Sequence, residues 1–168
     1  AKTWDRMRVA APGREIVGPL GREPYHMIHG ADLGRSWLAD LVQSPRVQLV
    51  RGGVRHVHEV EDGAIVNLHG KAIRGRWVFQ SFGHEPSPEA MSQHFGGWEV
   101  ETEAPSFDPG CFTLMEFGHP EAGPAFHYVL PITPHRALVE YTVFSDRPLR
   151  TVDYDAQVDA WLRRNVRG

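Results

Sequence analysis

The chain is 168 residues long, which suits one domain, and 41% of its residues are hydrophobic, enough to form a core. Its net charge of −3 comes from 18 basic and 21 acidic residues spread along the sequence, with no run of like charge to follow a phosphate backbone, so we expect no nucleic-acid partner. The single cysteine, Cys111, cannot form an internal disulfide, which favours a reducing compartment, by default the cytoplasm.

The first half of the chain combines short extended runs with one helix. Residues 7–11 and 14–17 flank the turn dipeptide Pro12-Gly13 and predict a hairpin. Residues 25–29 are predicted to be extended, and residues 31–42 place apolar side chains at helical offsets of three and four. A period of two then predicts a strand followed by a three-stranded meander, at residues 47–50, 54–60, 64–68 and 73–79.

A linker composition, GHEPSP at residues 83–88, marks the best internal boundary. Gly and Pro punctuate the extended stretches that follow, which is typical of an antiparallel sheet: residues 93–103, 112–117, 125–131 and 136–145. Residues 153–166 have the apolar spacing of a terminal helix. We therefore predict an α+β fold in two parts. Residues 1–83 form a helix, a strand and a β-meander, and residues 84–168 form an antiparallel sheet closed by a helix.

The predicted strand 137–144 carries a carboxylate between apolar neighbours. With a period of two, Glu140 shares one face with Leu138, Thr142 and Phe144, and the opposite face is also apolar. Desolvation in such a strand raises the pKa of a carboxyl group and lets it deliver a proton near neutral pH. The alternatives are an ion pair with Arg136 or Arg147, or an edge strand that exposes Glu140 to solvent.

A second acid and several aromatic residues lie on neighbouring predicted strands. Glu116 is expected to share a face with Phe112 and Leu114, so that two carboxylates could divide acid and base roles. Phe126, Tyr128 and Leu130 share a face of another strand, and Trp98 lies on the first strand of the same sheet. These side chains predict either an aromatic-lined slot or an ordinary apolar core.

The ten histidines invite a search for metal ligands. His56 and His58 would point the same way from a strand, but Glu61 follows too soon for a cupin-type site and no later segment supplies the rest of that pattern. We therefore expect no metal site. The sequence also lacks a Gly-x-Gly-x-x-Gly, Walker, Gly-x-Ser-x-Gly or Cys-x-x-Cys motif.

Residues 93–145 resemble bacterial and plant lycopene cyclases in motif, order and spacing. The matching segments are QHFGGWEVET (93–102), FDP (107–109), LMEF (114–117), FHYVLP (126–131) and LVEYT (138–142). In the family the last motif holds an acidic residue regarded as essential for acid/base chemistry, and by position this is Glu140. The strand with Glu116 usually carries Asp, then Phe or Trp, then Arg. This chain has Gly118 in the Arg position, so Glu140 is the stronger candidate.

The resemblance implies a flavoprotein of the hydroxylase-like type that closes rings on lycopene, or a related acyclic carotenoid, without net redox change. It implies reduced FAD beside the site and NAD(P)H as the reductant of the flavin. We expect Val54, Ser81 and Gly83 to lie nearest the flavin, and most of the flavin site to lie outside this chain, which lacks an initiating Met and so is expected to be an inactive central fragment. The residues expected to line the substrate slot are Trp98, Phe112, Phe126, Tyr128, Leu130 and Phe144.

Two other functions fit the same sequence. The first is a related flavoprotein that acts on a different apolar substrate. The second is a non-catalytic module that binds a lipid or isoprenoid. No stretch approaches the roughly eighteen apolar residues of a membrane span, so contact with the membrane surface is expected to be peripheral.

Overall fold

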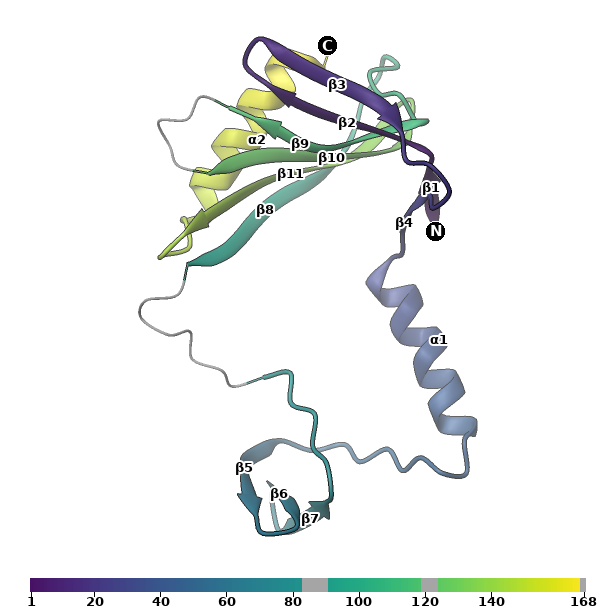
Figure 1. The fold of residues 1–168 in the computed structure, drawn as a ribbon, viewed down its shortest axis with the longest axis vertical. Coiled ribbons are helices and arrows are strands. Elements are labelled where there is room, and N and C mark those ends of the chain that lie inside the picture. The colour runs from purple at the N-terminus through teal and green to yellow at the C-terminus, as the bar shows by residue number, and fades with distance from the viewer. Residues whose placement is uncertain (83–90, 119–123, 167–168) are drawn as a thin grey trace. The chain divides into compact units, whose positions relative to one another are not determined.

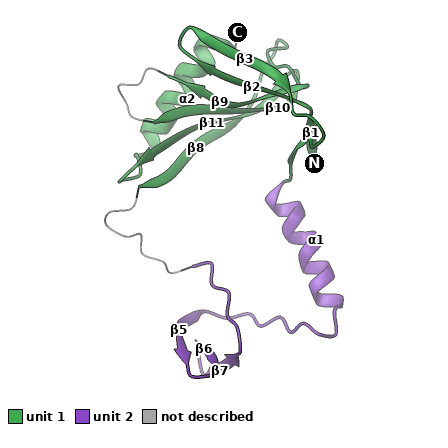
Figure 2. Cartoon of the chain, in the orientation of Figure 1, with its two compact units in different colours: residues 1–28, 86–168 green, residues 29–85 purple. Residues whose placement is uncertain are grey.

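The computed structural model describes residues 1–82, 91–118 and 124–166. The chain divides into two compact units, which are described separately (Figure 2). Unit 1 comprises Ala1–Ile28 and Pro86–Gly168, and unit 2 comprises His29–Glu85. The linker predicted at residues 83–88 lies outside the described residues.

Unit 1 is built on a six-stranded sheet with the order β3-β2-β9-β10-β11-β8 (Figure 1). Strands β2 and β9 are parallel, and the other neighbouring pairs in this sheet are antiparallel. A separate two-stranded sheet pairs β1 with β4. The elements of unit 1 are β1 Lys2–Trp4, β2 Arg6–Ala11, β3 Arg14–Pro19, β4 Tyr25–Met27, β8 Ser92–Glu101, β9 Cys111–Phe117, β10 Ala125–Thr133, β11 Arg136–Ser145 and α2 Thr151–Asn165.

The N-terminal hairpin β2–β3 confirms the prediction from the Pro12-Gly13 turn. Gly13 has a φ of 74°, a left-handed conformation that glycine adopts without steric cost. Through its parallel pairing with β9, the hairpin extends the sheet that holds the C-terminal strands. The boundary predicted at residue 83 placed this hairpin in the same part as residues 29–83. The pattern of a single strand does not identify a pairing partner about a hundred residues away.

Helix α2 covers one face of the sheet, which we call the helix face. Tyr154, Val158 and Trp161 of α2 are buried against the odd-numbered residues of β11, and Val158 is fully buried. The β11 residues of this cluster are Ala137, Val139, Tyr141 and Val143. The predicted terminal helix and its apolar stripe are thus confirmed, and burying each large side chain contributes about 1.5–3 kcal/mol.

The opposite side of the sheet, which bears Leu138, Glu140, Thr142 and Phe144, is called the Glu140 face. At one end of it, Trp4, Phe112 and Leu130 form a second buried cluster, packed with partly buried side chains that include Tyr25 and Tyr128. The Trp4 indole donates a hydrogen bond of 3.0 Å to the carbonyl oxygen of Pro131. Strands β1 and β4 therefore bring N-terminal aromatic residues onto this face.

Unit 2 contains α1 Gly30–Gln43 and a three-stranded antiparallel sheet of β5 Val54–Val60, β6 Gly63–Leu68 and β7 Lys71–Gly75. The predicted helix and meander are confirmed. The strand predicted at residues 47–50 is wrong, because this apolar run has no pairing partner in the sheet. The last strand ends at Gly75 rather than residue 79, and Trp77 and Phe79 are largely exposed. The mixed α+β class is as predicted, and the likeness to hydroxylase-like flavoproteins stays a prediction.

Candidate active site

Glu140 lies in the middle of β11, between two neighbouring strands. Its register partners are Tyr128 on β10 and Gly97 on β8. A Cβ atom placed on Gly97 would lie 2.6 Å from the Cγ of Glu140, so the acidic side chain occupies the space that a larger residue would fill. The absence of a side chain at position 97 therefore makes room for this carboxyl group.

The Glu140 carboxyl has no hydrogen bond or ion pair with any residue in the described parts of the chain. Arg136, one of the partners considered from the sequence, forms an ion pair with Glu99 instead, and Arg147 is exposed. Burial raises the pKa of Glu140 because the charged form loses hydration without gaining a partner. This geometry favours a group that holds its proton to higher pH than an ordinary glutamate.

Two tyrosines and a phenylalanine lie on one side of Glu140. The hydroxyls of Tyr25 and Tyr128 are 2.7 Å apart and share a hydrogen bond. The Tyr25 ring stacks on Phe112 with a centroid distance of 4.3 Å and an interplanar angle of 15°. Burial, and next the hydrogen bond with Tyr25, raise the pKa of Tyr128, which therefore stays protonated. Tyr25 is not predicted as a site residue from the sequence, because it contacts Phe112 and Tyr128 on strands far along the chain.

Aromatic rings also lie on the other side of Glu140, toward the opposite end of the strand. Phe126 is buried, and its ring centroid is 5.7 Å from that of Phe117 and 6.4 Å from that of Phe144. The structure thus brings several predicted slot residues onto one face with Glu140: Phe112, Phe126, Tyr128, Leu130 and Phe144. Their assignment to a substrate stays a proposal.

Trp98 does not join this group. It is paired with Val139, whose side chain is on the helix face, and its indole donates a hydrogen bond of 2.8 Å to Asp155 of α2. Trp98 and Glu140 therefore lie on opposite faces of the sheet. The prediction that Trp98 and Tyr128 line one slot is corrected, since strand alternation alone could not fix the register between β8 and β11.

Glu116 also lies on the helix face, so the prediction that it shares a face with Phe112 and Leu114 is wrong. Glu116 pairs with His127, whereas Thr113 pairs with Val129, so β9 has one more residue than β10 over this stretch. Such a β-bulge shifts the alternation of side chains by one position. Glu116 and Glu140 consequently face opposite sides and do not form a pair of catalytic carboxylates.

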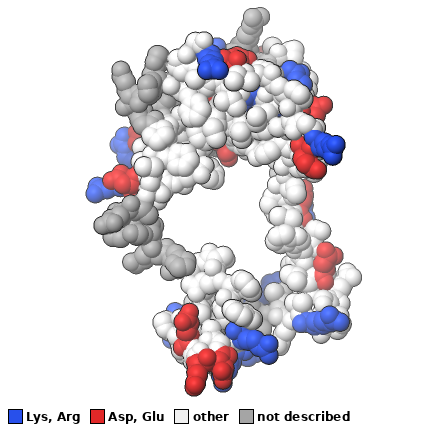
Figure 3. All heavy atoms as spheres, in the orientation of Figure 1, with Lys and Arg blue, Asp and Glu red and all other residues white. Residues whose placement is uncertain are grey.

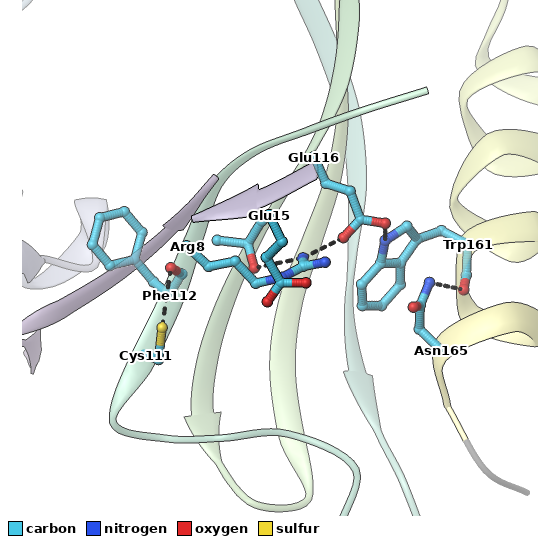
Figure 4. A network of polar contacts seen from close by, with 8 residues as sticks. Arg8, Glu15, Cys111, Phe112, Glu116, Trp161 and Asn165 are labelled. Carbon is cyan, nitrogen blue, oxygen red and sulfur yellow. Dashed lines mark hydrogen bonds and ion pairs between the residues drawn. The ribbon is translucent and has the colours of Figure 1, made fainter. Parts of the chain in front are cut away.

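The Glu116 carboxylate of β9 is held by a polar network that also includes residues of β2, β3 and α2 (Figure 4). It accepts a hydrogen bond of 2.5 Å from Arg8 of β2 and one of 3.0 Å from the Trp161 indole of α2. Arg8 also forms an ion pair of 3.3 Å with Glu15 of β3. The network borders a cleft of about 780 Å³, and it ties the N-terminal hairpin to the sheet and the helix.

We expect Glu116→Gln to weaken the fold more than the chemistry. The substitution removes the charge that Arg8 and Trp161 bind, and the half-buried Arg8 is left without its closest carboxylate. The free energy of unfolding should fall by about 1–3 kcal/mol, measured by urea denaturation. Asp159→Asn, which breaks the exposed pair with Arg163, is the matched control and should change stability little. Equal effects of the two substitutions would contradict a structural role for Glu116.

The residues predicted nearest a flavin all fall within the bounds of unit 2. Val54 begins β5 and is partly buried, Ser81 follows β7 outside any strand, and Gly83 lies outside the described residues. The rings of His56 and His58 stack at 5.5 Å. No group of three or more potential metal ligands occurs within residues 1–82, 91–118 and 124–166.

Comparison with known proteins identifies the family. The family model described as lycopene cyclase protein matches residues 1–166. The chain belongs to the lycopene cyclase family. This confirms the resemblance recognised in the strand motifs and covers the N-terminal hairpin as well. The searches of curated proteins and of solved structures found no match.

Proposed function

We propose that this chain carries the acid site of a lycopene cyclase, which converts lycopene or a related acyclic carotenoid into a cyclic carotene. The observation that supports it is the unpaired, half-buried carboxyl of Glu140 on a face lined by aromatic and aliphatic side chains. Membership of the lycopene cyclase family supports a carotenoid cyclase and accounts for an apolar substrate.

The reaction needs a proton to be added and a proton to be removed. A hydrocarbon offers only its double bonds, so we propose that the Glu140 carboxyl protonates the end group of the polyene. The resulting carbocation is attacked by a neighbouring double bond, which forms the ring carbon–carbon bond. The Glu140 carboxylate then takes a proton from an adjacent carbon, so the product is an isomer of the substrate and no electrons are transferred.

The aromatic residues have a separate role in this proposal. A carbocation is attracted to the electron-rich face of an aromatic ring, and this attraction is strongest where water is excluded. Tyr128 lies directly across the strand pair from Glu140, and Phe126 lies on the same face of β10. We propose that these rings stabilise the positive charge between protonation and proton loss.

Reduced FAD, with NAD(P)H as its reductant, is the proposed cofactor of the enzyme, and it would supply an electron-rich surface near a carbocation. No buried side-chain nitrogen or oxygen among the described residues lacks a hydrogen-bond partner, so no such atom marks a place for the flavin. Val54, Ser81 and Gly83 stay predicted neighbours of the flavin, and no step is assigned to the cofactor.

We expect the purified 168-residue chain to hold no stoichiometric flavin, because its sequence contains no Gly-x-Gly-x-x-Gly segment that would bind the pyrophosphate. The measurement is the absorbance near the flavin band after gel filtration of protein mixed with FAD. A yellow protein with one flavin per chain would overturn this prediction.

We further propose peripheral contact with a membrane, since lycopene dissolves in lipid. None of the described helices is both long enough and apolar enough to span a bilayer. In the view of Figure 3, uncharged side chains cover much of unit 1, and the visible acidic and basic side chains are interspersed. An apolar rim beside the Glu140 face would let the substrate pass from lipid to the site.

The function is tested by expressing the full-length gene that encodes this chain in cells that accumulate lycopene, and by identifying the carotenoids by chromatography. We expect a product with one or two rings. Unchanged lycopene in the presence of folded, flavin-loaded protein would refute the proposal and favour a flavoprotein with another substrate or a lipid-binding module.

A further inference from the structure

The hydroxyl pair of Tyr25 and Tyr128 is a polar contact within the apolar cluster beside Glu140. The two oxygens are 2.7 Å apart and come from β4 and β10. Either phenol can be the donor, but in both cases the oxygen of Tyr128 is held at Tyr25. The contact therefore fixes the direction of the Tyr128 side chain.

Tyr25 is itself held in place from two sides. Its ring stacks on Phe112 of β9 at 4.3 Å, and its centroid lies 6.3 Å from that of Trp4, its register partner on β1. Trp4 and Phe112 are each 1% exposed. A phenol packed against two buried rings has few rotamers available, so its hydroxyl is a fixed anchor for Tyr128.

Tyr128 is also the register partner of Glu140 on the same face of the sheet. Side chains directly opposite each other on antiparallel strands have Cβ atoms roughly 4.5–5.5 Å apart and interact readily. A phenol released from Tyr25 could donate to the Glu140 carboxyl across the strand pair, and the charge of Glu140 is already one of the causes that raise the pKa of Tyr128. A hydrogen bond donated to a carboxylate stabilises the ionised form and favours loss of the proton.

The other elements around Glu140 supply one further donor on this face, the hydroxyl of Thr142. Its partner on β8 is Gly97, and its neighbours along the same face of β11 are Leu138 and Thr142. On β8 and β11 the charged residues that share this face are Glu99, Glu101 and Arg136, and Glu99 forms an ion pair with Arg136. Tyr128 is the hydroxyl-bearing residue in direct register with Glu140, whereas Thr142 lies two residues further along the same strand.

We propose that Tyr25 is a positioning residue, which holds the Tyr128 hydroxyl away from Glu140 and so keeps the carboxyl free of a hydrogen-bond donor. This inference rests on the proposed role of Glu140 as the acid. It gives the N-terminal strand β4 a role at the site, because β4 carries the anchor for the tyrosine that faces the acid.

The test is a titration of the Glu140 carboxyl carbon by NMR, in protein labelled with ¹³C at glutamate side chains. Glu140→Gln identifies the signal by its loss. Tyr25→Phe keeps the ring that stacks on Phe112 and removes only the hydroxyl, and it should shift the Glu140 titration to lower pH. Adding Tyr128→Phe to Tyr25→Phe should return the titration to its wild-type position, since no phenol is left on Tyr128 to donate.

Tyr128→Phe alone is the second, independent variant. Because the wild-type Tyr128 hydroxyl is held at Tyr25, its removal should leave the Glu140 titration near its wild-type position. An unchanged titration in Tyr25→Phe, or an upward shift in Tyr128→Phe, would overturn the proposal. The titration is measured without turnover. The proposal about Tyr25 can therefore be overturned while Glu140 remains the acid, and it can be supported even if lycopene is not the substrate.

Discussion

Replacing Glu140 with glutamine should abolish ring closure while leaving the fold intact. Glutamine keeps the shape of the side chain and removes the proton that the proposed first step transfers. Loss of a positioned acid or base lowers rates on the order of a hundredfold to ten-thousandfold, so product should fall to a trace. The measurement is cyclic carotenoid formed per folded protein in lycopene-accumulating cells that express the variant full-length enzyme.

Glu99→Gln is the matched control, because Glu99 lies on the same face and differs in being paired with Arg136. Its loss breaks a partly exposed ion pair and should leave turnover close to wild type. If Glu140→Gln and Glu99→Gln reduce product to the same extent, a change in surface charge explains both. Normal turnover in folded Glu140→Gln protein would exclude Glu140 as the acid.

The difference in stability between the wild type and Glu140→Gln should depend on pH in a way that an ion pair cannot reproduce. Burial raises the folded-state pKa of Glu140 above its unfolded value of about 4.3. The folded state then retains a proton that the unfolded state has lost, so wild-type stability falls as pH rises from the unfolded pKa through the folded one. Glutamine at position 140 does not titrate, so the variant does not lose stability in this way as the pH rises.

The melting temperature of Glu140→Gln should therefore equal or exceed that of the wild type at neutral pH, and the difference should shrink toward pH 4. Thermal denaturation followed by circular dichroism at several pH values provides the measurement. A variant that melts well below the wild type at neutral pH would instead indicate that Glu140 stabilises the fold through a charged partner.

Local patterns were sufficient to predict most of the elements. The Pro12-Gly13 turn, the helical spacing of Tyr154, Val158 and Trp161, and the alternation around Glu140 each have a physical cause within a few residues. Strand β1 was missed because its three residues are too few to show a period. The strand predicted at residues 47–50 is wrong for the opposite reason. These residues show the apolar pattern of a strand, but no neighbouring strand pairs with them.

The candidate site could be predicted only where side chains alternate without interruption between the two faces of a strand. Glu140 and its neighbours Leu138 and Phe144 follow the period of two, and the register with β10 adds Phe126 and Tyr128. The bulge in β9 places Glu116 on the helix face. The register between β8 and β11 pairs Trp98 with Val139, so Trp98 also lies on the helix face. Bulges and registers depend on pairing between distant strands, which a single sequence does not display.

Two adjacent glycines on β8 give the last prediction. A Cβ on Gly97 would lie 2.6 Å from the Cγ of Glu140 and 2.5 Å from the carbonyl oxygen of Val139. Gly97→Ala should therefore push the acidic side chain and the adjoining backbone out of position. A displacement of about 1 Å at a reacting group can lower the rate about a hundredfold, so we expect a loss of that size in carotenoid formed per folded protein.

Gly96→Ala separates displacement of the acid from simple overcrowding. A Cβ on Gly96 would lie 2.8 Å from the Cβ and Cγ of Tyr154, on the helix face and away from Glu140. Overpacking typically costs about 1–3 kcal/mol, so both variants should be less stable than the wild type by urea denaturation. Only Gly97→Ala should also lose most of its turnover per folded molecule. Equal turnover in the two variants would mean that the position of the Glu140 carboxyl does not limit ring closure.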